Sequence, residues 1–256
     1  MIKRLKKLLQ RPVAELAFKG LPEKHRIYAV GDIHGRLDLL QLVHEKIGKH
    51  AQAYQGTKIV VYLGDYVDRG PHSMQVIDYL LANSLPDFDS VYLLGNHEQV
   101  LLQFLEGYSL DLAHDWFGFG GLATLQSYGV SLRGIPTPKD LPRIQAEFVE
   151  NCPVAHRQFF QKLVLNFELG GYFFVHAGIK PKLPLTNQTA DDMLWIRDEF
   201  LNSHRQFEKI IVHGHSVTEF PEIKSNRIGL DTGAYASGRL TCAVFEGVRV
   251  DFLKVG

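Results

Sequence analysis

The sequence predicts an α/β protein in which two mixed β-sheets pack together as a sandwich and helices flank the outer faces. In the N-terminal half, apolar runs typical of buried strands alternate with segments whose apolar residues recur at helical intervals. From about residue 163 onward, short strand-like runs predominate. Three of the early strands end in a glycine followed by a polar residue, and such strand ends are where α/β sheets place functional groups.

The N-terminal half is expected to contain three strand–loop–helix units. Strands are predicted immediately before Gly31, Gly64 and Gly95, because each of these glycines ends a short apolar run. Leu37–Ile47 and Met74–Leu81 carry apolar residues at helical spacing. We therefore expect these two segments to be crossover helices that cover one face of the sheet.

Residues 107–163 differ in composition, with aromatic residues and glycines crowded together. Leu122–Tyr128 and Phe148–Leu163 are expected to be helices, separated by a proline-rich loop at Arg133–Pro142. No linker-like stretch isolates this region, so we interpret it as a helical insert in a single domain of residues 21–256. An insert of this kind often shapes the rim of a substrate site, although ordinary helical packing explains most of its residues equally well.

The remainder of the chain is expected to be rich in strands. Residues 190–207 are predicted to be helical, and Glu246-Gly247 is a plausible hairpin turn. Strand–loop–helix units followed by a β-rich half favour two packed sheets. The predicted strands of this half are Leu163–Phe167, Tyr172–Val175, Lys209–Val212, Ile223–Leu230 and Arg239–Leu253.

Composition is that of an ordinary globular chain of 256 residues. Hydrophobic residues make up 45% and charged residues 22%, so a sizeable core is expected. Cys152 and Cys242 lie far apart and in no motif, which favours buried thiols in a reducing cytoplasm over a disulfide. No apolar run approaches the length of a membrane span, and a signal-peptide core is not evident. We therefore expect a cytoplasmic protein without stable membrane insertion.

Residues 1–20 form a basic N-terminal segment. Its first eleven residues carry five basic side chains and no acidic one, whereas the formal net charge of the whole chain is zero. Because the rest of the chain is therefore negative, no binding of nucleic acid is expected. Residues 1–10 have apolar positions at helical spacing, which fits either a membrane-surface or partner helix or, more simply, a short solvated helix.

Polar residues follow many of the predicted strands. Asp32, Asp65 and Asn96 are separated by 33 and 31 residues, about one βαβ unit each, so they meet at one sheet edge if their strands are parallel neighbours. Singly, an aspartate after a strand is often a turn or cap residue. A lone histidine is more often an ordinary hydrogen-bonding residue than a ligand. Together, the residues at these strand ends predict a metal site: Asp32, His34, Asp65, Asp68, Arg69, Asn96, His97, His176, His213 and His215.

The donor set indicates the kind of metal. Aspartate, histidine and asparagine without thiolate suit manganese, iron, zinc or cobalt rather than calcium or an iron–sulfur cluster. A carboxylate can bridge two ions. Two divalent ions with two aspartates and one hydroxide keep a net positive charge, as a site that accepts a phosphate dianion requires. Arg69 adds a planar fork of donors suited to orienting that phosphate.

Five ordered motifs carry a family resemblance. GDIHG (31–35), GDYVDRG (64–70), GNHE (95–98), HAG (176–178) and GHS (214–216) resemble those of the phosphoprotein phosphatase family, which belongs to the calcineurin-like metallophosphoesterases. The match spans about residues 27–216, and five motifs in order are far more specific than any one alone. The tail from Leu230-Asp231-Thr232-Gly233 to Leu240-Thr241 also resembles bacterial members, including symmetrical dinucleoside tetraphosphatases.

The resemblance implies a role for each matching position. His97 would be the general acid, oriented by Asp68, and Arg69 would bind the phosphate. A second phosphate-binding arginine is expected in a Trp-x-Arg context. Arg197 fits that context, with a surface salt bridge to Asp198 or Glu199 as the alternative. Asp32 and His34 would hold one metal ion, and Asp65 would bridge to the second. The remaining ligands of the second ion would be Asn96, His176 and His215. Whether His213 is also a ligand is left open.

The implied activity is metal-dependent hydrolysis of phosphomonoesters by direct attack of a metal-bridging hydroxide, with manganese as the first expectation for both ions. A serine/threonine protein phosphatase is the leading interpretation, acting on a phosphorylated protein or a small phosphoester. The alternative is a symmetrical dinucleoside tetraphosphate hydrolase, which would cleave diadenosine tetraphosphate. A non-catalytic scaffold on the same fold is disfavoured because no motif residue is missing. The oligomeric state is left open.

Overall fold

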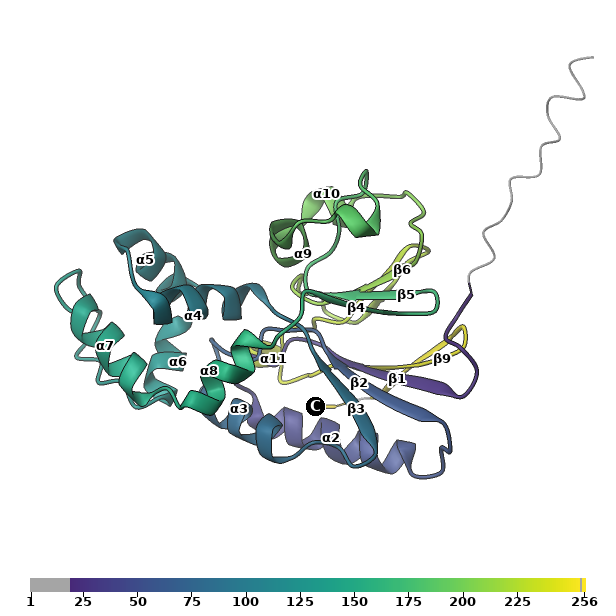
Figure 1. The fold of residues 1–256 in the computed structure, drawn as a ribbon, viewed down its shortest axis with the longest axis horizontal. Helices are drawn as coiled ribbons and strands as arrows, with labels where there is room; N and C mark the ends of the chain where they lie inside the picture. The colour runs from purple at the N-terminus through teal and green to yellow at the C-terminus, as the bar shows by residue number, and fades with distance from the viewer. Residues whose placement is uncertain (1–18, 254) are drawn as a thin grey trace, which may run out of the picture.

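The computed structural model describes residues 19–253 and 255–256. Two five-stranded sheets pack face to face, with α2 and α3 below one sheet and α9 and α10 above the other in Figure 1. The predicted fold class, an α/β sandwich of two mixed sheets flanked by helices, is confirmed. The helix predicted for residues 1–10 lies outside the described residues.

The first sheet has the strand order β10-β9-β1-β2-β3. Val30 pairs with Tyr62 and Tyr62 pairs with Tyr92, both in parallel register, so the three central strands end level with one another. The chain therefore leaves all three strands at the same edge. The elements of this layer are β1 (His25–Val30), α2 (Leu37–Ala51), β2 (Thr57–Tyr62), α3 (Ser73–Ala82), β3 (Phe88–Tyr92), β9 (Cys242–Glu246) and β10 (Arg249–Leu253).

The second sheet has the order β4-β5-β6-β8-β7. The helix predicted over 190–207 is two short helices that end at Leu201, so the prediction was wrong beyond that residue. The chain is extended at Ile196, which ends the first helix. The carbonyls of Ser203 and Arg205 accept hydrogen bonds from the side-chain amide of Asn226 rather than from backbone N–H groups of a helix. The elements of this layer are β4 (Asn166–Leu169), β5 (Tyr172–Val175), η1 (Leu185–Asn187), α9 (Ala190–Trp195), α10 (Asp198–Leu201), β6 (Ile210–His213), β7 (Glu222–Ile223), β8 (Arg227–Gly229) and α11 (Ala234–Ser237).

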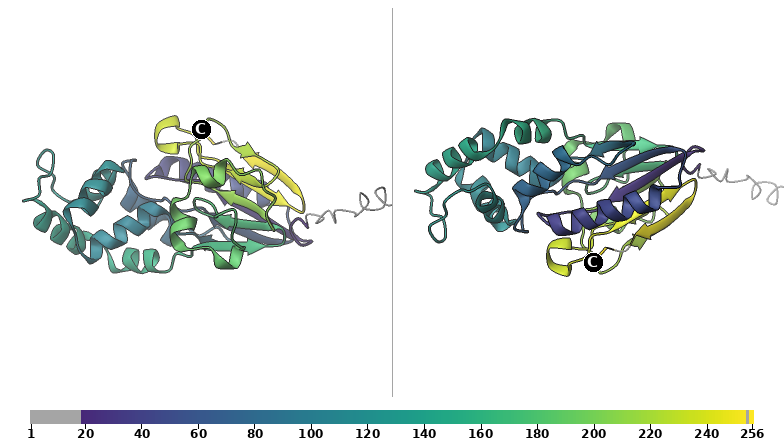
Figure 2. Two further views of the ribbon diagram at one scale, coloured as in Figure 1. Left: turned by 90° about the horizontal axis from the view of Figure 1, so that it is seen from above. Right: turned by 90° about the horizontal axis from the view of Figure 1, so that it is seen from below.

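The helices between β3 and β4 form a lobe at one end of the sandwich, as Figures 1 and 2 show. The helix predicted at Phe148–Leu163 is two helices, because Pro153 lacks an N–H and disfavours a helical Cys152. Residues 110–118, where no helix was predicted, are helical. The lobe comprises α4 (Asn96–Glu106), α5 (Leu110–Gly118), α6 (Gly121–Ser127), α7 (Leu141–Asn151) and α8 (Val154–Gln161).

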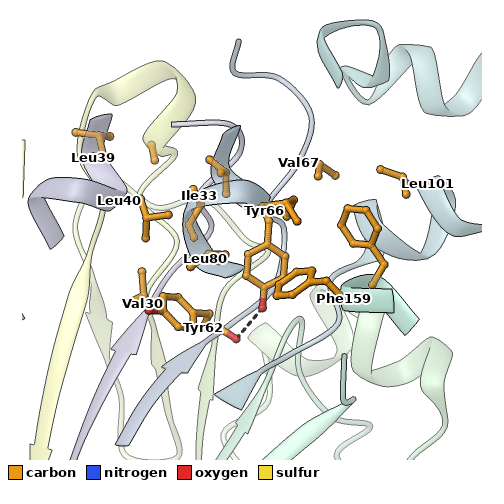
Figure 3. Close-up of a cluster of buried hydrophobic side chains, with 14 of the residues drawn as sticks. Val30, Ile33, Leu39, Leu40, Tyr62, Tyr66, Val67, Leu80, Leu101 and Phe159 are labelled. Carbon is orange, nitrogen blue, oxygen red and sulfur yellow. Dashed lines mark hydrogen bonds between the residues drawn. The ribbon is translucent and has the colours of Figure 1, made fainter. Parts of the chain in front are cut away.

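Alternation along β1 assigns its side chains to two cores. Tyr28 and Val30 face the helices, whereas Ile27 and Ala29 lie between the two sheets. Figure 3 shows part of the helix-side core, where Tyr66 packs edge-on against Phe159 with 5.6 Å between ring centroids.

The loop after β2 is anchored in that core. Tyr66 and Val67 are fully buried between Asp65 and Asp68, and the Tyr66 hydroxyl donates to the carbonyl of Leu93 at 2.9 Å. This apolar pair fixes the loop and leaves the two carboxylates free to face the strand ends. Within the part of the chain that the structure describes, no helix has the length and hydropathy needed to cross a membrane.

Candidate metal centre

The site lies where strands of both sheets end. Because β1, β2 and β3 are parallel neighbours, the loops that follow them meet at one edge, and the loops after β5 and β6 reach the same place from the second sheet. The side chains brought together there, all buried, are Asp32, His34, Asp65, Asp68, Asn96, His97, His176 and His215.

The backbone of these loops is unusual. Seven described residues other than glycine have a positive φ, a conformation that L-residues adopt rarely and at a cost. Five of the seven belong to the site: His34, Asp65, Asp68, Arg69 and His215. Backbone bonds hold the first two loops together, since the N–H groups of Ile33 and His34 both donate to the carbonyl of Asp65, at 3.0 and 2.8 Å. The fold therefore maintains local strain where it turns these side chains toward one another.

One group of candidate ligands contains His34, Asp65 and His97. His34 Nδ1 donates to the carbonyl of Val67 at 2.8 Å, which leaves Nε2 with its lone pair 3.5 Å from Asp65 Oδ2. Burial lowers the pKa of His34 to about 3, so the imidazole is neutral at pH 7. Two acceptor atoms thus face each other, an arrangement that a cation between them stabilises.

A second group contains Asp65, His176 and His215, with Asn96 beside them. His176 Nδ1 donates to the carbonyl of Leu63 at 2.8 Å, and its Nε2 lies 3.4 Å from Asp65 Oδ1 and 2.9 Å from Asn96 Oδ1. Asn96 Oδ1 is also 2.9 Å from His215 Nδ1. Asp65 therefore turns one carboxylate oxygen to each group, as a residue bridging two ions would.

The donor atoms fit divalent ions. Ligand atoms about 2.1 Å from one ion lie roughly 3 Å apart, close to the separations observed here. Asp32 Oδ1 and His215 Nε2 are buried and have no hydrogen-bond partner within the described residues. Burial lowers the pKa of His215 to about 2, so its ring is neutral and able to bind a cation. These unpartnered atoms and facing acceptors are what a metal centre without thiolate requires.

His97 and Asp68 form a hydrogen-bonded pair. His97 Nδ1 lies 2.7 Å from Asp68 Oδ2, while its Nε2 faces the site, 3.7 Å from Asp65 Oδ2. Burial lowers the pKa of His97, but the charge of Asp65 and the bond to Asp68 outweigh it and raise the pKa to about 9. His97 is therefore protonated at neutral pH, as a proton donor must be.

The helical lobe holds Asp68 in place. Trp116 Nε1 donates to its carboxylate at 3.0 and 3.2 Å, and the Thr124 hydroxyl donates to Oδ1 at 2.6 Å. The Asp68 N–H in turn donates to the hydroxyls of Thr124 and Ser73. Sequence reasoning missed Trp116 and Thr124 because they lie far along the chain from Asp68 in a region with no motif.

The two arginines occupy different positions. Arg69 is half-buried, with Nη2 3.4 Å from His97 Nε2 and its guanidinium 4.6 Å from the ring centroid of Tyr235. Arg197 is exposed between α9 and α10, and its charge acts on the pKa values of His176 and His215. Within residues 19–253, Arg197 forms no ion pair with its acidic neighbours, so the surface salt bridge considered above is not observed.

Comparison with known proteins assigns the chain to a family. The sequence profile described as calcineurin-like phosphoesterase matches residues 25–251. The chain belongs to this family. It is thus a metallophosphoesterase, a hydrolase of phosphoesters with candidate metal ligands in place.

Two curated relatives of this metallophosphoesterase share the name bis(5'-nucleosyl)-tetraphosphatase PrpE, marked asymmetrical. The protein from Halalkalibacterium halodurans is 26% identical over 243 residues, covering 88% of this chain and 92% of the relative. The protein from Anoxybacillus flavithermus is 27% identical over 225 residues, covering 83% and 87%.

Solved structures share the fold. One named for a diadenosine tetraphosphatase aligns with a TM-score of 0.56 and 24% identity, covering 92% of this chain and 96% of that one. A protein serine/threonine phosphatase from Saccharomyces cerevisiae aligns with a TM-score of 0.51 and 14% identity, covering 91% and 80%. At these identities the alignments establish the architecture of the phosphoesterase and nothing about its substrate.

His213 of the phosphoesterase belongs to neither group of candidate ligands. Its ring packs edge-on against Phe200, with 5.1 Å between centroids, and its Nδ1 lies 3.0 Å from the carbonyl of Gly214. His213 thus packs behind the site, with an Nε2 that is unpartnered within the described residues like that of His215, and His215 is the histidine of this motif that faces Asn96.

Glu98 is a structural anchor to which sequence reasoning gave no role, although it stands in the GNHE motif. It is fully buried at the start of α4, and its carboxylate accepts from the N–H groups of Asp65, Tyr66, Val67 and Gly95 at 2.8–3.2 Å. One side chain thus fastens the loop after β2 to the loop after β3 and fixes the position of Asp65.

Glu98→Gln is expected to lower the free energy of unfolding by about 2–4 kcal/mol, because a side-chain amide would confront backbone N–H donors in a buried place. Urea denaturation of the chelated protein measures this. Glu45→Gln is the matched control, since Glu45 is exposed on α2 and pairs with Lys49 one turn along that helix; its midpoint should match the unmodified protein. An unchanged midpoint for Glu98→Gln would contradict the anchoring role.

Proposed function

We propose that this metallophosphoesterase hydrolyses phosphomonoesters of alcohols, with phosphoserine and phosphothreonine in proteins as its substrate class. The observation that carries this proposal is the buried His97–Asp68 pair, with His97 Nε2 turned into the site. An alkoxide is a poor leaving group and gains from a positioned proton donor, whereas a phosphate leaves readily without one. A dedicated acid therefore suits an alkyl phosphoester.

The proposal assigns the ligands to two divalent ions, manganese first and iron, zinc or cobalt next. When bound, the ions would supply Lewis acidity toward the phosphate oxygens and activate a water molecule. Asp65 would be shared, because its two oxygens face the two groups. The remaining ligands would be Asp32 and His34 for one ion, and Asn96, His176 and His215 for the other.

The other residues act on the phosphate and the leaving oxygen. Arg69, half-buried beside His97, would bind phosphate oxygens through its planar fork, and Arg197 would add a second cationic contact from the rim. His97 would transfer the proton on Nε2 to the departing oxygen. Asp68 keeps the ring oriented and stabilises its charge, and Trp116 with Thr124 keeps Asp68 from turning away.

The involvement of the helical lobe supports the proposed domain organisation. Trp116 and Thr124 belong to the region proposed as an insert, residues 107–163, yet they bind a residue of the loop after β2. We therefore propose one catalytic domain of residues 21–256 rather than two separable units. Cys152 and Cys242 are buried thiols, which suits the proposed location in a reducing cytoplasm.

A second candidate substrate is a dinucleoside tetraphosphate. The names of the curated relatives favour it and specify asymmetrical cleavage, whereas the sequence-based alternative was symmetrical cleavage. Asymmetrical cleavage yields a nucleoside triphosphate and a monophosphate, and symmetrical cleavage yields two diphosphates. The products therefore identify which bond is broken.

One assay compares these substrates. Chelated enzyme is reloaded with Mn²⁺ and given a phosphoserine/phosphothreonine peptide, an aryl phosphate and diadenosine tetraphosphate at equal concentrations. The proposal expects faster phosphate release from the peptide than cleavage of the dinucleotide. Preferential cleavage of the dinucleotide would overturn the protein-phosphatase proposal, and chromatography of the nucleotides would then separate the two modes of cleavage.

A further inference from the structure

A further buried carboxylate, Asp231, lies beside the metal centre without an assigned role. It follows Leu230, whose carbonyl oxygen lies so close to Gly31 that a Cβ there would come within 2.6 Å of it. Asp32 is the next residue after Gly31, so the two aspartates directly follow the two residues that make this backbone contact. Both have an exposed fraction of only 2%.

The charge of Asp231 acts on Asp32. Burial raises the pKa of Asp32, and the next largest cause is the charge of Asp231, ahead of that of Asp65. Asp231 is therefore a buried carboxylate whose charge acts at the proposed Asp32–His34 site, although the ligand assignment counts only Asp32 and Asp65 there.

Within the described residues, the carboxylate of Asp231 accepts one hydrogen bond and forms no ion pair. Its Oδ1 accepts the N–H of Gly233 at 2.8 Å, a bond within its own turn. Across the residues described by the structure, ion pairs form at Asp65 and Asp68, but no basic side chain pairs with Asp231. A buried, unpaired carboxylate is costly unless a cation lies nearby, and the ion beside Asp32 would be that cation.

We propose that Asp231 is a positioning residue of the metal centre, which raises the affinity of the Asp32–His34 site for its divalent ion without being a ligand itself. One of its carboxylate oxygens is already engaged by the N–H of Gly233 within its own turn. Residues just outside the ligand shell typically change metal affinity by about 10–100-fold when they are replaced. This inference rests on the ligand assignment proposed above and does not depend on the substrate.

The negative charge of Asp231 also changes the net charge expected for the metal centre. Two divalent ions with Asp32, Asp65 and a hydroxide keep a net positive charge, and an ionised Asp231 cancels it. Arg69 and Arg197, both of which act on the pKa of Asp231, then supply the positive potential that attracts a phosphate dianion.

Asp231→Asn tests the proposal because asparagine keeps the shape and can still accept the Gly233 N–H. Binding of Mn²⁺ to the chelated protein is measured by titration calorimetry and by metal analysis after equilibrium dialysis, with no substrate present. We expect two ions per chain at saturation, with one of the two affinities about 10–100-fold weaker than in the unmodified protein. Far-ultraviolet circular dichroism should be unchanged.

The other outcomes are decisive as well. Two unchanged affinities would overturn the proposal, and loss of one ion even at saturation would overturn it in favour of a direct ligand. Asp251→Asn on β10 is the matched control, since Asp251 pairs with Arg249 away from the site and should leave both affinities unaltered. If Asp231→Asn misfolds, Asp231→Ser takes its place. Failure of the peptide assay would leave this result untouched, because ion binding is measured directly.

Discussion

Asp65→Asn is expected to abolish binding of both ions and to lower kcat by about 10³-fold or more, since the ions would supply several kcal/mol of transition-state stabilisation. Asp65 Oδ2 is 3.5 Å from His34 Nε2, and Oδ1 is 3.4 Å from His176 Nε2. An amide nitrogen at either position would replace an anionic acceptor with a donor. The change therefore acts on both groups at once, whereas a change in any one histidine acts on one group.

Metal analysis after dialysis measures this effect, in parallel with hydrolysis of an aryl phosphate. His176→Ala is the informative comparison, because it should weaken one ion and spare most binding of the other. Normal metal content in Asp65→Asn would remove its assignment as the shared ligand. Loss of a single ion would assign Asp65 to one group only.

His97→Ala is expected to slow hydrolysis of alkyl phosphates by about 10²–10⁴-fold and that of activated aryl phosphates far less. An aryl oxide leaves without help, so it has little need of the proton on His97. Because His97 Nδ1 is committed to Asp68, the ring is held as a donor, and the variant should retain both ions. The measurement is kcat for a phosphoserine peptide and for p-nitrophenyl phosphate, with metal content determined alongside.

Equal losses on the two substrates would contradict a general-acid role for His97, and loss of an ion would mark it as a ligand of the group it shares with His34. Asp68→Asn tests the same mechanism through the partner of His97. Its loss of kcat should again be larger for alkyl than for aryl phosphates but smaller than in His97→Ala, because the His97 imidazole would keep its place and lose only its charged partner.

The strand ends of the N-terminal half were predictable because their signals are local. Apolar runs, glycine stops and a repeat of about one βαβ unit lie within short windows of sequence. Parallel pairing then necessarily placed Asp32, Asp65 and Asn96 at one edge. The second half was predicted less well, because its helices are short and tertiary contacts such as those of Asn226 determine where they end.

The sequence alone determined the fold class, the family and the chemical types of the donors, since these follow from motifs and their order. Only the tertiary structure decided which atoms face each other: the two groups that Asp65 faces, the support of Asp68 by Trp116 and Thr124, and the close contact of Leu230 with Gly31, the residues that precede Asp231 and Asp32. The Asp68 contacts join residues 48 and 56 positions apart. Such pairs have no local pattern, because burial and packing of the two sheets and the helical lobe bring them together.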